Sequence, residues 1–176
     1  MTGVAGAVPP LLDPHRLELR PARLADMAQV GPLINGFAMR GIMLPKSLEQ
    51  LHRNFREFVV AREVGGRVLG CVALRVFSPD LAELSALAVA TEATGRGIGR
   101  RLVDAVVEEA KALGIGTLFA LTLEPGFFHR LGFETVPRAL FPQKIAADCD
   151  GCDRRGGCRE ITVARSLGPD AIVPTR

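Results

Sequence analysis

The sequence predicts a single mixed α/β domain, of the α+β type, in which an antiparallel meander leads into a strand–helix–strand crossover. Three observations predict it: apolar or alternating runs typical of strands, apolar stripes at helical spacing, and Gly or Pro between these segments. The 176 residues suffice for one hydrophobic core and are too few for two ordinary domains. We expect a flexible arm at residues 1–16, the domain at residues 17–167 and a tail at residues 168–176.

The N-terminal third predicts one strand and two helices. Alternating polarity over residues 17–20 indicates a strand, and Asp26 can cap a helix over residues 27–37, although Pro32 disfavours its interior. A second helix follows, because Ser47 opens a capping-box pattern. This helix would end near residue 56, with Leu48, Leu51 and Phe55 on its apolar face.

Three strands follow and form the meander. Residues 58–61 and 68–77 are apolar, and the two glycines between them predict a tight hairpin. A turn at Pro79 leads to a third strand over residues 82–89. Alternation along this strand would place four side chains on one face: Glu83, Ser85, Leu87 and Val89.

The strongest periodic pattern is an amphipathic helix over residues 98–113, which Gly114 ends. Its expected buried stripe is Leu102, Val103, Val106, Val107, Ala110 and Leu113. An apolar strand after the helix completes the crossover. We expect this strand at residues 117–123, a short helix at 126–131, and final strands at 133–136 and 161–164.

The composition excludes several classes of protein. The net charge of +3, with acidic and basic residues interleaved, lacks the basic stripe of a nucleic-acid-binding protein. No uncharged stretch approaches the roughly 20 apolar residues that cross a bilayer, and the N-terminus has no basic start of a signal peptide. We therefore expect no nucleic acid partner, no membrane association and a cytoplasmic location. The chain has no Tyr and no Trp, so no tyrosine can donate a proton.

A glycine-rich loop lies between the third meander strand and the amphipathic helix. Backbone N–H groups and the dipole at a helix N-terminus bind phosphate, and glycine lets the phosphate approach closely. A P-loop would need Lys and then Ser or Thr where this chain has Arg100 and Arg101, and a Rossmann loop would need glycine at Leu102. The alternative is a loop whose glycines only allow a turn. The candidate phosphate-binding residues are Thr94, Gly95, Arg96, Gly97, Ile98, Gly99 and Arg100.

The loop and the later segment at residues 127–133 resemble two motifs of the GNAT family of N-acetyltransferases, and the order of elements also matches. The resemblance implies a GNAT-like acyl-CoA N-acyltransferase fold with acetyl-CoA as cosubstrate. It places the backbone of Leu87, Ala88 and Val89 against the pantetheine arm of the cofactor. Phe128 occupies the position where the family usually has a proton-donating tyrosine beside the cofactor.

Acetyl transfer to an amine requires a base for the amine proton and N–H donors for the oxyanion. Glu83 is the candidate base, because it heads the apolar strand that leads into the loop; the alternative is a solvated charge at a strand end. Thr122, near the end of the next strand, can donate a hydrogen bond or relay a proton through water. The alternative for Thr122 is a threonine that only packs in the strand.

Several segments resemble N-acetylglutamate synthases, which acetylate the α-amine of L-glutamate in the first step of arginine biosynthesis. These are residues 41–47, 70–74, 81–89 and 118–122. The two carboxylates of glutamate need cationic partners, and the candidates are Lys46, Arg154, Arg155 and Arg159. The alternative for each Arg is a solvated surface charge. Another small amine, a protein N-terminus or a non-catalytic acyl-CoA sensor remain as alternative functions, and the resemblance leaves a homodimer open.

Three cysteines lie close together in the sequence, at Cys149, Cys152 and Cys158. They follow the segment Pro142-Gln143-Lys144-Ile145, and the combination resembles some short synthases. Three thiols suit zinc, but a closed structural site needs a fourth ligand, for which Cys71 or His129 is available. We expect no resident metal. Reduced thiols that shape a loop and a redox-sensitive pair are the other interpretations.

Overall fold

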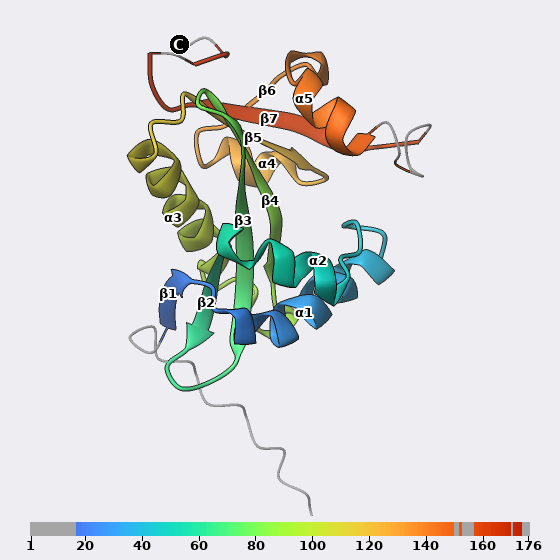
Figure 1. The fold of residues 1–176 in the computed structure, drawn as a ribbon, viewed down its shortest axis with the longest axis vertical. Helices are drawn as coiled ribbons and strands as arrows, with labels where there is room; N and C mark the ends of the chain where they lie inside the picture. The colour runs from blue at the N-terminus through green and yellow to red at the C-terminus, as the bar shows by residue number, and fades with distance from the viewer. Residues whose placement is uncertain (1–16, 150–151, 153–156, 170, 174–176) are drawn as a thin grey trace, which may run out of the picture.

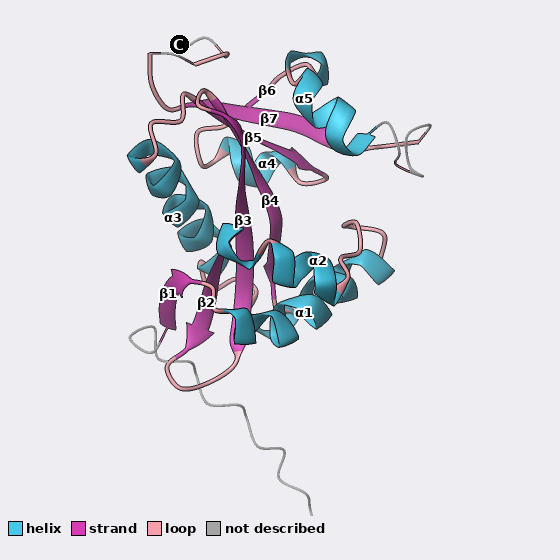
Figure 2. Cartoon of the chain, in the orientation of Figure 1, coloured by secondary structure: helices cyan, strands magenta, loops and turns pink. Residues whose placement is uncertain are grey.

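The computed structural model describes residues 17–149, 152, 157–169 and 171–173, so the expected arm at residues 1–16 and part of the expected tail lie outside it. Its strands are β1 (Leu17–Pro21), β2 (Phe58–Glu63), β3 (Val68–Ser78), β4 (Leu81–Val89), β5 (Thr117–Thr122), β6 (Glu134–Thr135) and β7 (Ile161–Ser166). Its helices are α1 (Met27–Met39), α2 (Leu48–Arg53), α3 (Ile98–Ala112), α4 (Pro125–His129) and the short α5 (Pro142–Lys144) (Figure 2).

One sheet of seven strands, in the order β1-β2-β3-β4-β5-β7-β6, runs through the described part of the chain. Strands β1 to β4 pair antiparallel, as expected for the meander. Strand β5 pairs parallel to β4, because α3 returns the chain to the starting edge of the sheet. Figure 1 places β5, β6 and β7 at one end of the molecule and β1 and β2 at the other. The mixed α/β class and the crossover predicted from the sequence are therefore confirmed.

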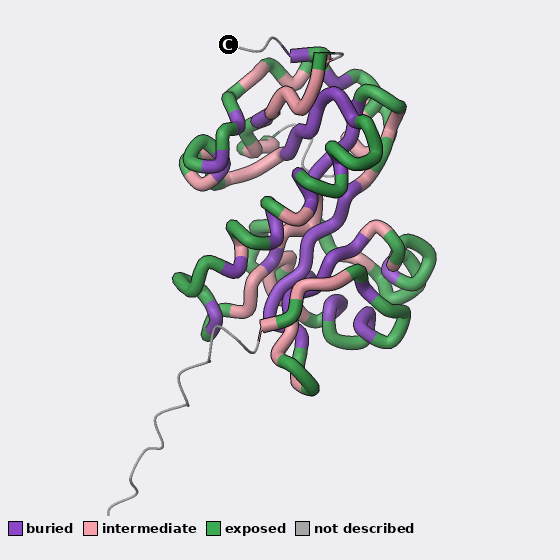
Figure 3. Tube along the Cα trace, turned by 90° about the vertical axis from the view of Figure 1, so that its left-hand side faces the viewer, coloured by how far each residue is buried: buried purple, intermediate pink, exposed green. Residues whose placement is uncertain are grey.

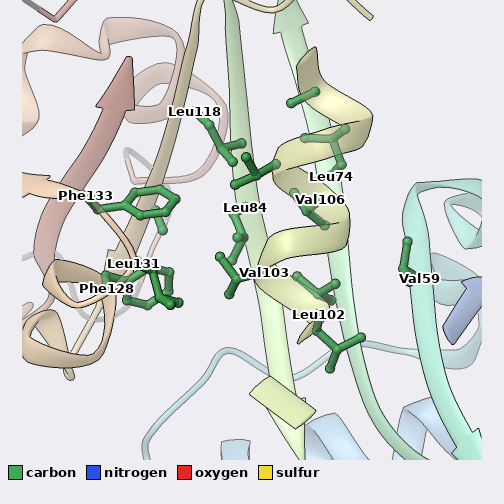
Figure 4. Packing of buried hydrophobic residues seen from close by; sticks show 14 of the residues in the cluster. Val59, Leu74, Leu84, Leu102, Val103, Val106, Leu118, Phe128, Leu131 and Phe133 are labelled. Carbon is green, nitrogen blue, oxygen red and sulfur yellow. The ribbon is translucent and has the colours of Figure 1, made fainter. Parts of the chain in front are cut away.

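Helix α3 covers one face of the sheet, and α1 and α2 cover the other (Figure 1). The stripe of α3 packs against residues of the central strands, which form the most continuous buried stretch of the chain (Figures 3 and 4). The buried residues of this stripe are Leu102, Val103, Val106, Val107 and Ala110. Leu113 was expected in the stripe but is 59% exposed, because α3 ends at Ala112 and Ile115 fills the core beyond it.

The second helix is shorter than expected. The capping box of Ser47 is present, but α2 ends at Arg53 and a separate 3-10 turn leads into β2. Leu48, at the start of α2, is 51% exposed, whereas Leu51 is fully buried. A helix of six residues presents little more than one turn to the core, so the predicted three-residue apolar face is only partly right. Among the described residues, no helix has both the length and the apolar content to cross a membrane.

Asp26 does not cap α1 as the sequence predicts. Its buried carboxylate instead accepts hydrogen bonds from both terminal nitrogens of Arg20, at 2.8 and 3.0 Å, and from the backbone N–H of Arg23 at 2.7 Å. Arg62 lies 3.7 Å away on β2. Burial acts to raise the pKa of Asp26, but these donors and charges hold it below its usual value. The carboxylate therefore links the first strand and the first helix to the meander.

We predict that Asp26→Asn lowers the free energy of unfolding by about 3 kcal/mol at pH 7, since it leaves a largely buried arginine without its counter-charge. The pKa of Asp26 is lower in the folded chain, so this stability is present above the unfolded pKa and is lost as pH falls through the folded pKa. Urea denaturation at several pH values measures both effects.

The matched control is Glu18→Gln, because Glu18 is about half exposed and lies 3.9 Å from the same arginine. The control should change the free energy of unfolding by less than about 0.5 kcal/mol. Equal destabilisation by the two variants would contradict the role given to the buried carboxylate.

Candidate functional site

The parallel strands β4 and β5 pair only over a short distance. Leu81–Glu83 lie opposite Thr117–Phe119, and no further pair joins the two strands within the described residues. From Glu83 onward, the edge of β4 that faces β5 therefore has backbone N–H and C=O groups free of strand pairing. Glu83 lies at the point where the two strands begin to diverge.

A bulge in β4 occurs three residues beyond this point. Ala86 has a φ of +52°, a left-handed conformation that a residue with a side chain adopts only under constraint. The register with β3 shifts across it, from Ala73↔Ser85 to Cys71↔Ala88. The thiol of Cys71 donates a hydrogen bond of 3.5 Å to the Ala86 carbonyl. The bulge re-aims the backbone groups on the unpaired edge of β4.

The bulge also overturns the expected alternation along β4. Leu87 and Val89 pack with the cluster beneath α3, together with Leu84, and so lie on the face opposite Glu83. The sequence predicted that Glu83, Leu87 and Val89 share one face. That prediction was wrong, because the extra residue at the bulge shifts the alternation by one position.

The glycine-rich loop leads into α3 and leaves backbone N–H groups at the helix N-terminus available to an anion. Gly95 and Gly97 have φ values of +80° and +75°, and Gly97 precedes the helix without any side-chain cap. The first backbone hydrogen bond of α3 runs from Arg101 to the Gly97 carbonyl, which leaves the preceding N–H groups pointing out of the helix. Arg96 and Arg100 are exposed around this end. This arrangement offers the backbone N–H donors that a phosphate needs, and the phosphate-binding role of residues 94–100 stays a prediction.

The two adjacent phenylalanines after β5 have different surroundings. Phe128 is 5% exposed and packs edge-to-face on Phe133 in the core beneath α3. Phe127 is half-buried, and its ring lies 3.5 Å from where a Cβ on Gly99 would be. Phe127 therefore packs beside the loop at Gly99, at a distance that a Cβ would also accept. The sequence placed Phe128 beside the cofactor, but the structure brings Phe127 closer to the loop.

The carboxyl group of Glu83 is buried, with 3% of the residue exposed. Its Oε1 accepts a hydrogen bond from Lys144 Nζ at 2.7 Å, while its Oε2 has no hydrogen-bond partner among the described residues. Burial raises the pKa of Glu83, and the positive charge of Lys144 opposes this. A buried carboxylate with one free oxygen and a raised pKa is suited to accept a proton. The alternative of a solvated charge at a strand end is excluded by its burial.

Lys144 belongs to a network that the sequence analysis missed. Lys144 Nζ lies 2.8 Å from Asp148 Oδ2, and Asp148 is also paired with Arg75. Arg75 is the partner of Glu83 across the β3–β4 register, so two cations and two anions form a chain of ion pairs from Glu83 through Lys144 and Asp148 to Arg75. Asp148 lies in a π-helical turn (Ile145–Cys149) directly after α5. The one sequence signal was the Pro142-Gln143-Lys144-Ile145 segment, to which no role was assigned.

Thr122 and Lys46 are two further residues to which the sequence assigns a role in the site. Thr122 ends β5, beyond the divergence of the strands, and its Oγ1 accepts a hydrogen bond of 2.9 Å from the Glu124 N–H. Lys46 lies in the loop before α2, where its backbone N–H and C=O both bond to the Asn35 side chain. The pKa of Glu57 rises through burial, and both Arg75 and Lys46 act to lower it. Among the described residues, no hydrogen bond or ion pair joins Lys46 to Glu83, so the substrate-binding role of Lys46 stays a prediction.

A cavity of about 200 Å³ lies beyond the end of β5, lined by Gly41, Leu123, Gly157, Cys158, Arg159 and Glu160. It joins the loop that precedes α2 to the segment that precedes β7. Arg159 is exposed and lines this cavity, and its role in binding an anionic substrate stays a prediction. Arg138 anchors the segment, donating a hydrogen bond of 2.7 Å to the Glu160 carbonyl. Arg154 and Arg155 lie outside the described residues.

All four cysteines are free thiols. Cys158 lies 3.5 Å from both Arg138 and Glu160 through its Sγ, and the N–H of Cys152 bonds to the Cys149 carbonyl. In the part of the chain that the structure describes, no group of three or more His, Cys, Asp or Glu side chains is arranged to hold a metal ion. Cys71 is fully buried, and burial raises the pKa of its thiol to about 12.

Known proteins resemble this chain in sequence. The model of the acetyltransferase (GNAT) family matches residues 36–133. An uncharacterized N-acetyltransferase of Chlorobaculum tepidum is 40% identical over 149 residues, which cover 85% of this chain and 96% of that protein. An amino-acid acetyltransferase of Mycobacterium tuberculosis is 38% identical over 120 residues, covering 67% of this chain and 68% of that protein.

Solved structures give the same relationship. The N-acetylglutamate synthase from Neisseria gonorrhoeae, complexed with coenzyme A and N-acetyl-glutamate, superposes with a TM-score of 0.78 at 30% identity over 86% of this chain. This chain spans about a third of that synthase, 35% of its length. A Mycobacterium tuberculosis protein in complex with CoA has a TM-score of 0.73 at 30% identity, with 85% of this chain and 99% of that chain covered.

The surroundings of the thiols predict their reactivity. At pH 8, we expect a disulfide reagent such as Ellman's to titrate three thiols per folded chain and a fourth only after denaturation, because Cys71 is buried and protonated. Cys149 should react more slowly than an exposed thiol, since burial raises its pKa. The control is Cys71→Ser, which should show three thiols in both states. Four equivalent thiols in the folded wild type would show that Cys71 is accessible.

Proposed function

The chain belongs to the acetyltransferase (GNAT) family and is an acetyl-CoA-dependent N-acetyltransferase, and we propose that its acceptor is the α-amine of L-glutamate. Two relationships support this acceptor: the identity to an amino-acid acetyltransferase and the structural likeness to an N-acetylglutamate synthase bound to N-acetyl-glutamate. The reaction would then be the first step of arginine biosynthesis.

Acetyl-CoA would bind where the sheet opens. Its pyrophosphate would lie at the N-terminus of α3, against the backbone N–H groups of residues 97–100, with Arg96 and Arg100 adding positive charge. The pantetheine arm would extend along the unpaired edge of β4 and hydrogen-bond the backbone of Leu87–Val89 as a strand would. This leads the thioester toward the bulge at Ala86 and the divergence point at Glu83.

The buried carboxylate with a free oxygen is the observation on which the mechanism rests. In the proposed reaction, Glu83 Oε2 takes a proton from the ammonium group of the acceptor, directly or through one water. The amine nitrogen then bonds to the thioester carbonyl carbon, and a backbone N–H at the bulge stabilises the oxyanion. The intermediate loses the second proton of its nitrogen, collapses by breaking the C–S bond and releases the CoA thiolate, which takes up that proton through water. Thr122 Oγ1 would hydrogen-bond this water and relay the proton, accepting one proton as it passes another on, because the chain has no tyrosine to act as an acid.

The acceptor would occupy the cavity beyond β5. Arg159 lines this cavity and can pair with one carboxylate in a bidentate manner. Lys46, across the loop that also contributes Gly41, would bind the other carboxylate. Arg154 and Arg155 stay as further candidates. Glu160 also lines this cavity, and its negative charge would favour an acceptor that carries an ammonium group.

We predict that Glu83→Gln lowers kcat about 10²- to 10⁴-fold, because it removes the proton acceptor and keeps the size of the side chain. The dissociation constant for acetyl-CoA, measured by calorimetry, should stay within a factor of two. Glu108→Gln on the exposed face of α3 is the control and should keep wild-type kcat. Unchanged turnover in Glu83→Gln would eliminate the assigned base and favour a non-catalytic acyl-CoA sensor.

A panel of amino acids tests the acceptor. With acetyl-CoA, L-glutamate should release CoA faster than L-glutamine, L-aspartate or a peptide with a free N-terminus. Arg159→Ala should raise the KM for glutamate by about tenfold or more, which corresponds to losing one charged hydrogen-bonded contact, and leave the KM for acetyl-CoA unchanged. If glutamate gives no CoA release above the water blank while another amine does, the glutamate proposal is wrong and the acetyltransferase assignment stands.

A further inference from the structure

Lys144 is a largely buried cation that touches the proposed base. Its side chain is 13% exposed, and Nζ bonds to Glu83 Oε1 at 2.7 Å and Asp148 Oδ2 at 2.8 Å. A lysine that only improved solubility would extend into water. Burying a charged ammonium is unfavourable unless its partners are held in good geometry, so this contact needs a structural support.

That support comes from an aromatic stack. Phe141, immediately before α5, is fully buried and stacks on Phe119 of β5, with ring centroids 4.2 Å apart and an interplanar angle of 7°. Phe119 is also the register partner of Glu83 across the β4–β5 pair. The stack therefore fixes α5 over the same strand pair from which Glu83 projects. One turn later, Asp148 is tied to Arg75 of β3.

The pairing of the two Glu83 oxygens is asymmetric. Lys144 occupies Oε1, and Oε2 has no hydrogen-bond partner in the described part of the chain. A carboxylate free to rotate would present either oxygen to the reacting amine. We infer that Lys144 is a positioning residue, which holds Oε1 so that Oε2 receives the proton of the acceptor and which keeps the carboxylate ionised until it does. This inference rests on the proposed base function of Glu83.

Charged groups on several elements act on Glu83, and some raise its pKa while others lower it. Lys144 of α5 and Arg75 of β3 lower the pKa of Glu83, whereas Asp148 of the π-helical turn and burial raise it. The register partner of Glu83 on the neighbouring β5 is Phe119, which is uncharged. Arg75 and Lys46 also act to lower the pKa of Glu57, which burial raises. Burial acts to lower the pKa of Lys144, but the carboxylates of Glu83 and Asp148 raise it above its usual value, so Lys144 stays a cation at neutral pH.

The pH profile of kcat/KM for the acceptor, at saturating acetyl-CoA, tests the inference. Loss of the positive charge in Lys144→Met should move the acidic limb of the profile upward by about 1–3 pH units. At a pH below both limbs, kcat/KM should be lower than in the wild type by about tenfold for every pH unit that the limb moves. Lys144→Arg should restore most of the wild-type profile, because it keeps the charge at the same oxygen. Lys111→Met, which removes an exposed lysine of α3, is the control and should not move the limb.

For a second variant we expect the acidic limb of the pH profile to move in the opposite direction. Asp148→Asn removes an anion that raises the pKa of Glu83, so its acidic limb should move downward. A general loss of structure would not move the two limbs in opposite directions. Circular dichroism and calorimetric CoA binding confirm that each variant is folded, and if Lys144→Met does not fold, the Asp148→Asn and Lys144→Arg profiles still decide.

The outcomes distinguish a failure of the base function of Glu83 from a failure of the positioning role of Lys144. If wild-type protein acetylates no amine, or Glu83→Gln retains full turnover, the base function itself is wrong. If wild type shows a Glu83-dependent acidic limb that Lys144→Met leaves in place, the positioning inference alone is wrong. A raised KM for the acceptor with an unmoved limb would instead make Lys144 a substrate contact and would also overturn the inference.

Discussion

The site depends on the early end of one strand pair. Parallel pairing of β4 and β5 stops at Glu83, and everything proposed for the cofactor and the base follows from that divergence. It leaves a free strand edge for the pantetheine arm, which a continuous sheet would not offer. The last residue of β4 that pairs with β5 is Glu83, so its carboxylate lies where the two strands begin to separate. The bulge at Ala86, whose carbonyl accepts a hydrogen bond from the Cys71 thiol, changes the direction of the backbone groups on the free edge of β4.

The buried carboxylates of Asp26 and Glu83 differ in their hydrogen bonding and therefore in their roles. Asp26 accepts hydrogen bonds on both oxygens and has a lowered pKa, so it acts as a fixed anion that ties elements together. Glu83 has one oxygen paired and one unpaired, and its pKa is raised. An unsatisfied buried oxygen is unfavourable for folding and is retained where a ligand is to supply its partner. The difference in hydrogen bonding, not the residue type, separates the structural group from the reactive one.

Most of the fold could be predicted from the sequence, because its signals are local. The α3 stripe, the hairpin, the meander and the crossover follow from periodicity and turn residues within short windows, and the loop with its glycines marks the anion site. The bulge at Ala86 could not be predicted, since alanine carries no turn signal and the register shift involves the pairing with the neighbouring strand β3. The chain of ion pairs through Glu83, Lys144, Asp148 and Arg75 joins residues of β3 and β4 to residues about 60 positions later in the sequence. Packing of Phe141 on Phe119 brings α5, with Lys144 and Asp148, to the strand pair that carries Arg75 and Glu83.

A crystal structure with CoA and L-glutamate bound tests the central claim most directly, through the distance between Glu83 Oε2 and the acceptor nitrogen. The account predicts that the pantetheine arm lies between β4 and β5 and that Oε2 lies about 2.6–3.2 Å from that nitrogen, or one water away, with Lys144 still on Oε1. Pantetheine bound elsewhere, or an acceptor nitrogen with no path to Oε2, would contradict it.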